Sequence, residues 1–247
     1  MDMTNHQQFI VALADAIRAR APLPPFPAGV TMDEAYRMLP AAAARVCDSG
    51  TSGLKAGLTN PELQALFGLD EALIGLIYDW GECPNGVALP FREYARIECE
   101  LAVVLSAEGA LVALALAIEI VHLNFAAPED FTPANLVMSS LGADSYICGS
   151  PIPWGELDQS VIRSTAIKLE RDGELLHLAN AGDSLNGPER AVDWCVNEAR
   201  KRSLEIADGT TLLTGTCGDA LPGLPGDYKA DFGELGTLRF TIETPAG

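Results

Sequence analysis

The chain has 247 residues and a formal net charge of −18 at pH 7, which argues against the basic surfaces that bind nucleic acid or anionic membranes. Its length suits one large domain, and 48% hydrophobic with 20% charged residues is typical of a globular protein with a sizeable core. Six cysteines without a C-x-x-C pair favour reduced thiols over zinc sites or disulfides. The N-terminus shows no pattern of a secretory leader, and we expect a cytoplasmic protein.

Helices are expected before residue 70. Apolar residues at helical spacing predict an amphipathic helix over residues 5–20, which a proline-rich stretch ends. A second helix begins at Thr31; Pro40 should end or kink it, and residues 41–47 could resume it. Pro61, at a first-turn position, predicts a short helix over residues 60–69.

Strands dominate the chain after residue 90. Alternating or apolar patterns predict them over residues 96–105, 146–149, 160–169, 175–178, 210–215 and 237–242. Residues 107–121 are expected to form a helix, or a helix followed by a strand, and residues 188–202 a helix. We therefore expect a helical part at 1–69 and a β domain at 70–247 that together form one structural unit.

Three glutamates stand out in the strand-rich part. Glu98 and Glu100 are two residues apart in the alternating segment 96–105, so their side chains share one strand face. Glu119 is the only charged residue between Leu111 and Val121, where a carboxylate must be paired or ligated. A hard divalent cation such as Mg²⁺ would offset the three charges, because it prefers carboxylate oxygens. A solvated strand face with Lys or Arg partners explains the pattern about as well.

Lys55 is a lone cation in the glycine-containing segment from Gly53 to Thr59. Most lysines lie at the surface, and that interpretation applies here too. A lysine held among small residues near acids can instead be desolvated and serve as an acid or base.

Five segments, in this order and spacing, resemble the 2-keto-4-pentenoate hydratase branch of the fumarylacetoacetate hydrolase superfamily. They are Lys55-Ala56-Gly57-Leu58-Thr59, Arg96-x-Glu98-x-Glu100-Leu101-Ala102, Ala117-Ile118-Glu119-Ile120-Val121, Leu212-Leu213-Thr214-Gly215-Thr216, and Gly226-Asp227 followed by Leu235-Gly236. The resemblance covers the chain from about Gly53 to its end. It implies an α+β fold, a mixed β-roll with N-terminal helices, in a homo-oligomeric cytoplasmic enzyme of aromatic catabolism. Association with another enzyme of the same pathway is a further implication.

The resemblance also implies a site and a reaction. Glu98, Glu100 and Glu119 would hold Mg²⁺ or Mn²⁺, to which a 2-oxo or 2-hydroxydienoic acid binds through its carboxylate and 2-oxygen. Lys55 would move the proton during ketonisation, and water would add to give a 4-hydroxy-2-oxo acid. The base for water would be Asp79 or a water on the metal, although Asp79 is equally well explained as a solvated loop acid.

Two segments depart from the family pattern. Residues 138–145 replace an Asp-Asn-Ala-Ser type of segment and could still line a pocket with small polar side chains. Arg190 occupies a position that usually carries an amide, where it could face solvent or bind a second substrate carboxylate. His122 could lie near the metal or be a satisfied, partly buried histidine. The irregular segment 124–145 is predicted to act as a lid.

Other functions remain open at this point. Decarboxylation of a 2-oxo-3-enedioate would use the same metal site without adding water. Hydrolysis of an acylpyruvate ranks below it, because it needs an activated water and the only N-terminal histidine, His6, falls on an exposed helix. A catalytically altered homologue that binds a small acid or a partner subunit is the alternative outside enzymology.

Overall fold

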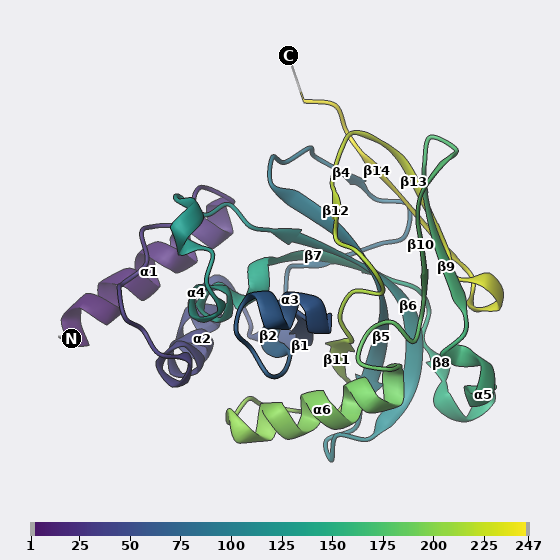
Figure 1. The fold of residues 1–247 in the computed structure, drawn as a ribbon, viewed down its shortest axis with the longest axis horizontal. Coiled ribbons are helices and arrows are strands. Elements are labelled where there is room, and N and C mark those ends of the chain that lie inside the picture. Colours follow the sequence, from purple (N-terminus) through teal and green to yellow (C-terminus); the bar gives the residue numbers. More distant parts are fainter. Residues whose placement is uncertain (1–2, 246–247) are drawn as a thin grey trace.

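The structure, a computed structural model, describes residues 3–245, which form two sheets with the two N-terminal helices to one side (Figure 1). The larger sheet has the strand order β2-β1-β11-β5-β6-β7-β3, with β12 paired to β5 and β8 to β6. The smaller sheet has the order β10-β9-β13-β14-β4. Pairing in both sheets is mixed, with parallel contacts between β1 and β11, β3 and β7, and β4 and β14. The fold is therefore α+β, as predicted.

The strands and helices have the following bounds. The strands are β1 Thr51–Gly57, β2 Leu73–Tyr78, β3 Glu82–Cys83, β4 Ala88–Leu89, β5 Ala95–Leu105, β6 Leu111–His122, β7 Ala143–Cys148, β8 Ile152–Pro153, β9 Ala166–Arg171, β10 Glu174–Asn180, β11 Thr210–Leu213, β12 Leu221–Pro222, β13 Gly226–Asp231 and β14 Thr237–Ile242. The α-helices are α1 Met3–Ala19, α2 Met32–Val46, α3 Pro61–Leu66, α4 Pro133–Met138, α5 Gln159–Ile162 and α6 Pro188–Lys201. No helix within residues 3–245 is long and apolar enough to cross a membrane.

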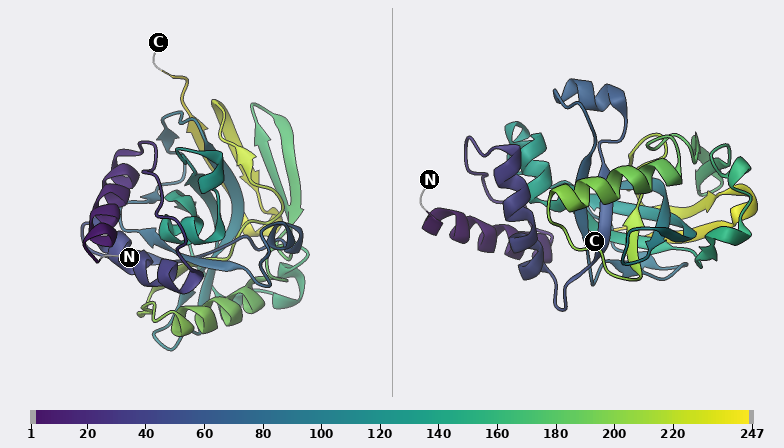
Figure 2. Two further views of the ribbon diagram at one scale, coloured as in Figure 1. Left: turned by 60° about the vertical axis from the view of Figure 1, so that its left-hand side comes forward. Right: turned by 90° about the horizontal axis from the view of Figure 1, so that it is seen from below.

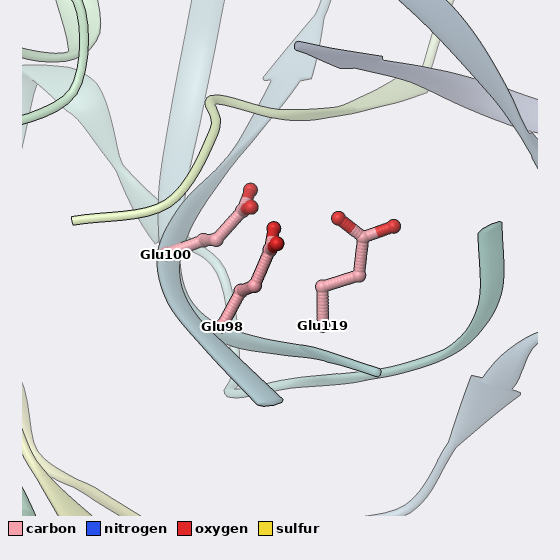
Figure 3. A group of neighbouring side chains, drawn as sticks. All are labelled: Glu98, Glu100 and Glu119. Atoms are coloured by element: carbon pink, nitrogen blue, oxygen red, sulfur yellow. The ribbon is translucent and has the colours of Figure 1, made fainter. Parts of the chain in front are cut away.

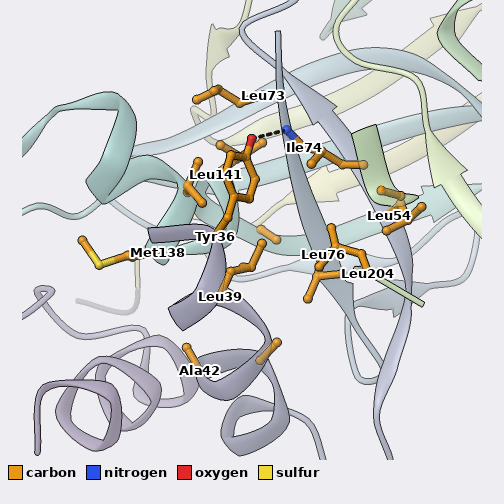
Figure 4. Packing of buried hydrophobic residues seen from close by; sticks show 14 of the residues in the cluster. Tyr36, Leu39, Ala42, Leu54, Leu73, Ile74, Leu76, Met138, Leu141 and Leu204 are labelled. Atoms are coloured by element: carbon orange, nitrogen blue, oxygen red, sulfur yellow. Dashed lines mark hydrogen bonds between the residues drawn. The ribbon is translucent and has the colours of Figure 1, made fainter. Parts of the chain in front are cut away.

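Helices α1, α2 and α4 pack beside one end of the larger sheet, and α6 runs across it (Figure 2). Thr31 caps α2 through reciprocal hydrogen bonds with Glu34, as its position predicts. Of the two outcomes predicted for Pro40, an end of the helix does not occur, because α2 continues through the proline to Val46. Buried residues on both sides of the proline, including Leu39 and Ala42, pack against β2 and α4 and offset the lost backbone hydrogen bond (Figure 4).

The smaller sheet covers one face of β5 and β6. Ile97, Cys99 and Leu101 of β5 point into this apolar interface, which also holds the stacked rings of Tyr228 and Phe240. Alternate side chains of a strand point to opposite faces, so the even-numbered side chains of β5 from 96 to 100 lie on the other face. The sequence pattern thus decides which side chains of β5 face the candidate site.

β6 is a strand over its whole length, and the expected helix at 107–121 does not form. Its side chains are buried on both faces, so the run of apolar residues carries no alternation that would distinguish a strand from a buried helix. Part of the predicted strand 160–169 is likewise the short helix α5, and the strand begins only at Ala166. The predicted hairpin then follows, with β9 paired to β10.

The larger sheet crosses the predicted boundary at residue 69. β1 lies in the part expected to be helical, yet it pairs antiparallel with β2 and parallel with β11. The division into 1–69 and 70–247 therefore cuts through one sheet, because strand pairing between distant segments leaves no local mark in the sequence. Lys55 on β1 reaches the centre of the molecule through this pairing.

Candidate metal centre

The three predicted carboxylates converge at the middle of the larger sheet. In the antiparallel pair β5 and β6, Glu98 lies directly opposite Glu119, and Glu100 is the next residue on the same face of β5. One carboxylate oxygen from each glutamate lies within 4.8 Å of the others. Figure 3 shows the three side chains, two from one strand and one from its neighbour, directed into the same space.

Burial makes this arrangement unfavourable without a counter-charge. Glu100 and Glu119 are 0% and 1% exposed. Burial, reinforced by Glu119 and Glu98, raises the pKa of Glu100 well above its usual range. Burial also raises the pKa of Glu119 to about 7, although Lys55 opposes the shift.

Two carboxylate oxygens at this site have no hydrogen-bond partner in the part of the chain that the structure describes. They are Oε1 of Glu100 and Oε2 of Glu119. The other oxygen of Glu100, Oε2, accepts a hydrogen bond from the backbone N–H of Gly215 at 2.8 Å. Buried polar atoms are rarely left unpaired, and carboxylate oxygens are ligands that Mg²⁺, Mn²⁺ and Ca²⁺ prefer. The donor set therefore fits a hard divalent cation.

Lys55 completes the buried cluster and is 1% exposed. Its Nζ donates a hydrogen bond to Oε1 of Glu119 at 2.5 Å. Burial alone would lower the pKa of Lys55, but attraction to Glu119, Glu98 and Glu100 outweighs it and raises the pKa, so the amine is protonated. Gly75 on β2 leaves room for the side chain, since a Cβ there would lie 3.2 Å from Cγ of Lys55.

The segment after α4 supplies one more contact to Lys55. The carbonyl oxygen of Leu141 lies 3.4 Å from Nζ of Lys55. Ser140 and Leu141 both have left-handed backbone conformations, with φ of 52° and 55°. Such strain in consecutive non-glycine residues persists only where the surroundings impose it, and here it directs a carbonyl group into the site.

A pocket of about 680 Å³ opens above this cluster. Lys55 and Glu98 lie at its inner end, and apolar side chains form one wall. These apolar residues are Leu58, Leu63, Phe67, Phe131, Leu136 and Leu141. Its polar lining includes Thr216, whose buried hydroxyl has no hydrogen-bond partner within residues 3–245. The pocket suits a small acid with an apolar carbon chain.

Known proteins similar to this chain carry two related names. A 2-keto-4-pentenoate hydratase of Burkholderia vietnamiensis (strain G4 / LMG 22486) is 25% identical over 206 residues, which cover 77% of each protein. A 4-oxalocrotonate decarboxylase of Pseudomonas putida is 26% identical over 188 residues, which cover 71% of this chain and 70% of the relative. No family model matches the chain.

The fold leads to the same group of proteins. The structure of 4-oxalocrotonate decarboxylase from Pseudomonas putida G7, complexed with magnesium and adipate, has a TM-score of 0.88 at 21% identity and covers 98% of each chain. In sequence and in fold the chain thus resembles the hydratase and decarboxylase branch of the fumarylacetoacetate hydrolase superfamily. The predicted resemblance and fold class are confirmed.

The structure does not bring Asp79 to the carboxylate cluster. Asp79 follows β2, four residues beyond the Gly75 that pairs with Lys55, which is roughly 13 Å along the strand. Its Oδ2 accepts hydrogen bonds from the backbone N–H groups of Asp48 and Ser49. Burial raises the pKa of Asp79, but the hydrogen bonds together outweigh it and lower the pKa, which makes Asp79 a weaker base. Asp79 therefore anchors a loop and is poorly placed to activate water at the pocket.

The residues that depart from the family pattern also lie outside the pocket or have structural roles, apart from Leu141. Arg190 is exposed on α6 and does not line the pocket. Ser140 of segment 138–145 is buried and bridges the N–H and carbonyl groups of Leu76, while Asp144 binds Arg20 and Arg92. The expectation that this segment lines the pocket with small polar side chains is therefore wrong, since Leu141 is its contribution.

His122 lies on the face of β6 opposite Glu119. One ring nitrogen is 3.0 Å from the carbonyl oxygen of Glu93, and burial lowers the pKa of the ring. Of the two alternatives for His122, the structure therefore supports the partly buried histidine whose hydrogen bonding is satisfied within the protein. Three residues at the site were not predicted from the sequence, namely Arg96, Leu141 and Thr216. Arg96 had a signal, because it shares the strand face of Glu98 and Glu100, and Thr216 ended a segment that resembles the family, but neither was given a role.

Proposed function

We propose that the protein is a hydratase that depends on a divalent metal and adds water to a 2-hydroxydienoate or 2-oxo-enoate to give a 4-hydroxy-2-oxo acid. The observation that carries the proposal is the convergence of three carboxylates, two of them fully buried, with the buried amine of Lys55 beside a pocket. Relatives named 2-keto-4-pentenoate hydratase support the reaction class, a carbon–oxygen lyase.

Glu98, Glu100 and Glu119 would hold the metal, which we propose to be Mg²⁺ or Mn²⁺. When bound, such a cation supplies Lewis-acid stabilisation of negative charge on the substrate oxygens. The chain itself prepares the site, because Gly215 fixes one oxygen of Glu100 and leaves the other directed at the shared space. Lys55 fixes Glu119 in the same way through Oε1.

Lys55 is the group placed to move a proton. It is protonated through its pairing with Glu119, and it lines the pocket at the end where the carboxylates meet. It can therefore donate a proton to the carbon chain of a dienol and take it back in the reverse direction. The apolar wall from α3 and Leu141 holds that chain and limits the approach of bulk water. The free hydroxyl of Thr216 can orient the water that adds.

The test is turnover of 2-hydroxypenta-2,4-dienoate by the full chain, first with EDTA and then with Mg²⁺ or Mn²⁺. Loss of the dienol absorbance should depend on metal, and the product should gain the mass of one water. Glu98→Gln should abolish turnover, whereas Glu174→Gln, the same change at an exposed hairpin position, should not alter it. Metal binding without turnover of this acid or of a longer homologue would refute the proposal.

Decarboxylation of a 2-oxo-3-enedioate stays as the second candidate, because relatives with that activity in their names are equally similar. Released carbon dioxide, in place of added water, identifies it directly. Hydrolysis of an acylpyruvate is less favoured, since no histidine is among the described residues that line the pocket. A homologue that only binds a small acid or a partner subunit would bind metal and 2-oxo acids without turnover.

We also propose that the enzyme is a cytoplasmic homo-oligomer of aromatic catabolism, able to associate with another enzyme of its pathway. Exposed leucines at positions 175 and 178 lie on β10, the outer strand of the smaller sheet, where a second copy could pair. Sedimentation velocity would test the oligomer, and a monomer at micromolar concentration would count against it.

The lid proposed for residues 124–145 is supported by Phe131 and Leu136, which line the pocket. Equal protease sensitivity with and without metal and a 2-oxo acid would refute the lid.

A further inference from the structure

Ser184 is a buried polar side chain close to the carboxylate cluster. It is 1% exposed and lies in the loop between β10 and α6. Its Oγ donates a hydrogen bond to the carbonyl oxygen of Thr214 at 2.7 Å. Thr214 directly follows β11 and precedes Gly215, whose N–H binds Oε2 of Glu100. Ser184 is therefore separated by one peptide group from a carboxylate of the candidate metal centre.

The hydrogen bonds of Ser184 and Glu100 are made to the two ends of this peptide group. The carbonyl of Thr214 and the N–H of Gly215 belong to one planar trans unit, so they point in opposite directions. The carbonyl oxygen accepts from Ser184 at 2.7 Å, and the N–H donates to Glu100 at 2.8 Å. Rotation of the peptide about the axis between its flanking Cα atoms moves both ends together. A restraint on the carbonyl is therefore also a restraint on the N–H that fixes Glu100.

The backbone at this peptide needs such a restraint. The N–H and the hydroxyl of Thr214 both donate to the carbonyl oxygen of Leu101, which fixes the chain before the peptide. Gly215, after it, has a φ of +94° and no Cβ, so its own conformation resists rotation only weakly. A Cβ at Gly215 would lie 2.8 Å from Oγ of Ser184, so the glycine also gives the hydroxyl room to approach.

The loop that carries Ser184 is itself held in place. Before Ser184, the N–H of Gly182 donates to the carbonyl oxygen of Arg163 at 2.9 Å. After it, the N–H of Gly187 donates to the carbonyl oxygen of Ser184, also at 2.9 Å. The two residues that follow Ser184 are not glycines, yet they have φ of 46° and 62°, a conformation that persists only where the surroundings impose it. Ser184 therefore reaches the peptide from a fixed position.

We propose that Ser184 is a positioning residue of the metal centre, because it fixes the peptide group that orients Glu100. The inference rests on the metal site of the proposed function and adds a residue that binds neither metal nor substrate directly. Hydrogen bonds in series polarise one another, so the hydroxyl also makes the N–H of Gly215 a stronger donor. Without the hydroxyl the peptide can turn, and Glu100 loses the bond that directs its other oxygen, Oε1, into the shared space of the cluster.

The test is isothermal titration calorimetry of Mn²⁺ into the full chain after treatment with EDTA and its removal. Ser184→Ala should weaken Mn²⁺ binding about 10-fold, the lower end of the range for groups that orient metal ligands. Ser139→Ala is the matched control, since Ser139 is 2% exposed and donates to backbone carbonyls at the end of α4. Each variant loses a buried hydroxyl, so both should melt at a lower temperature in EDTA. Only Ser184→Ala should lose affinity for Mn²⁺.

Hydrogen exchange of the Gly215 amide, followed by NMR in EDTA, gives a second measurement that needs no metal. Exchange should be at least about 10-fold faster in Ser184→Ala and unchanged in Ser139→Ala, because only the first loosens this N–H. Unchanged exchange or unchanged Mn²⁺ affinity in Ser184→Ala would overturn the inference. Equal loss of Mn²⁺ affinity in both variants would also overturn it, because that pattern indicates a general loss of stability.

Turnover of 2-hydroxypenta-2,4-dienoate separates this inference from the proposed function. Metal-dependent hydration by the unaltered protein, with unchanged Mn²⁺ affinity in Ser184→Ala, would keep the hydratase and overturn the role of Ser184. Weaker Mn²⁺ binding and faster Gly215 exchange in Ser184→Ala, without hydration by the unaltered protein, would confirm the positioning role and count against the hydratase.

Discussion

Replacing Glu100 by glutamine should make the metal-free protein more stable and remove its response to metal. Glu100 is fully buried beside Glu98 and Glu119, and its Oε1 has no partner within the described chain. Glutamine has the same shape, keeps a carbonyl oxygen for the N–H of Gly215, and brings no negative charge. The substitution therefore removes repulsion at the site without opening a cavity.

The expected size follows from the burial of this carboxylate. An unsatisfied buried polar group costs about 1–3 kcal/mol. For a chain of this length each kcal/mol shifts Tm by about 2–4 °C, so the metal-free variant should melt about 2–12 °C above the unaltered protein. Mn²⁺ at about 100 times its Kd should stabilise the unaltered protein by about 2.7 kcal/mol, or about 5–11 °C. The variant should lose most of that shift.

The difference in Tm between the metal-free Glu100→Gln variant and the metal-free unaltered protein should grow as the pH rises. Burial, with Glu119 and Glu98 beside it, raises the pKa of Glu100 above the ordinary 4.5. Between 4.5 and the raised value the folded protein holds a proton that the unfolded chain has released, so stability falls as pH rises through this window. The glutamine variant has no such group, and its advantage in EDTA should therefore be larger at pH 8 than at pH 5.

Differential scanning calorimetry in EDTA and in Mn²⁺, at both pH values, checks these expectations. Glu174→Gln, the matched change at an exposed position, should follow the unaltered protein under every condition. A metal-free Glu100→Gln protein that melts below the unaltered one at pH 8 would contradict the argument from buried charge. A full metal shift in that variant would show that Glu100 is not a ligand.

Three further substitutions test the rest of the site. Lys55→Met breaks a buried ion pair and should lower Tm by about 6–20 °C in calorimetry and slow hydration at least about 100-fold in the dienol assay. Gly215→Ala puts a Cβ 2.4 Å from Cγ2 of Thr59 at a φ of +94°, so it should displace the N–H that holds Glu100 and weaken Mn²⁺ binding at least about 10-fold by titration calorimetry. Asp79→Asn should leave kcat/KM unchanged and lower Tm by a few degrees, since the amide oxygen accepts weaker hydrogen bonds from the loop at Asp48 and Ser49. A loss of about 100-fold in kcat/KM would instead show that Asp79 takes part in the reaction.

Local patterns were enough to predict part of this site. The alternation in 96–105 identified β5 and set Glu98 and Glu100 on one face, because a half-buried strand must repeat every two residues. The charge of Glu119 stood out against an apolar run for the same energetic reason that now raises its pKa. These signals come from residues whose surroundings are set by their own strand.

Other features depend on pairing between distant segments and left no such mark. β1 joins the sheet through β11, more than 150 residues later, so nothing near Lys55 indicated that it lies beside Glu119. β6 is buried on both faces and could not be told from a helix. The resemblance implied Asp79 as a possible base, yet the register of β1 and β2 carries it away from Lys55.

Arg96 follows the same two-residue alternation of β5 as Glu98 and Glu100, but that alternation alone did not mark it as a pocket residue. Its parity with Glu98 and Glu100 was visible from the start, but a charged residue at the beginning of a strand usually faces solvent. Only the pocket, and the lack of an ion pair for Arg96 among the described residues, give that parity a meaning. Because Arg96 and the glutamates project from one strand, the distance between them is fixed by the pitch of β5 and not by a loop. The separation between the guanidinium and the carboxylates is therefore a property of the sheet itself.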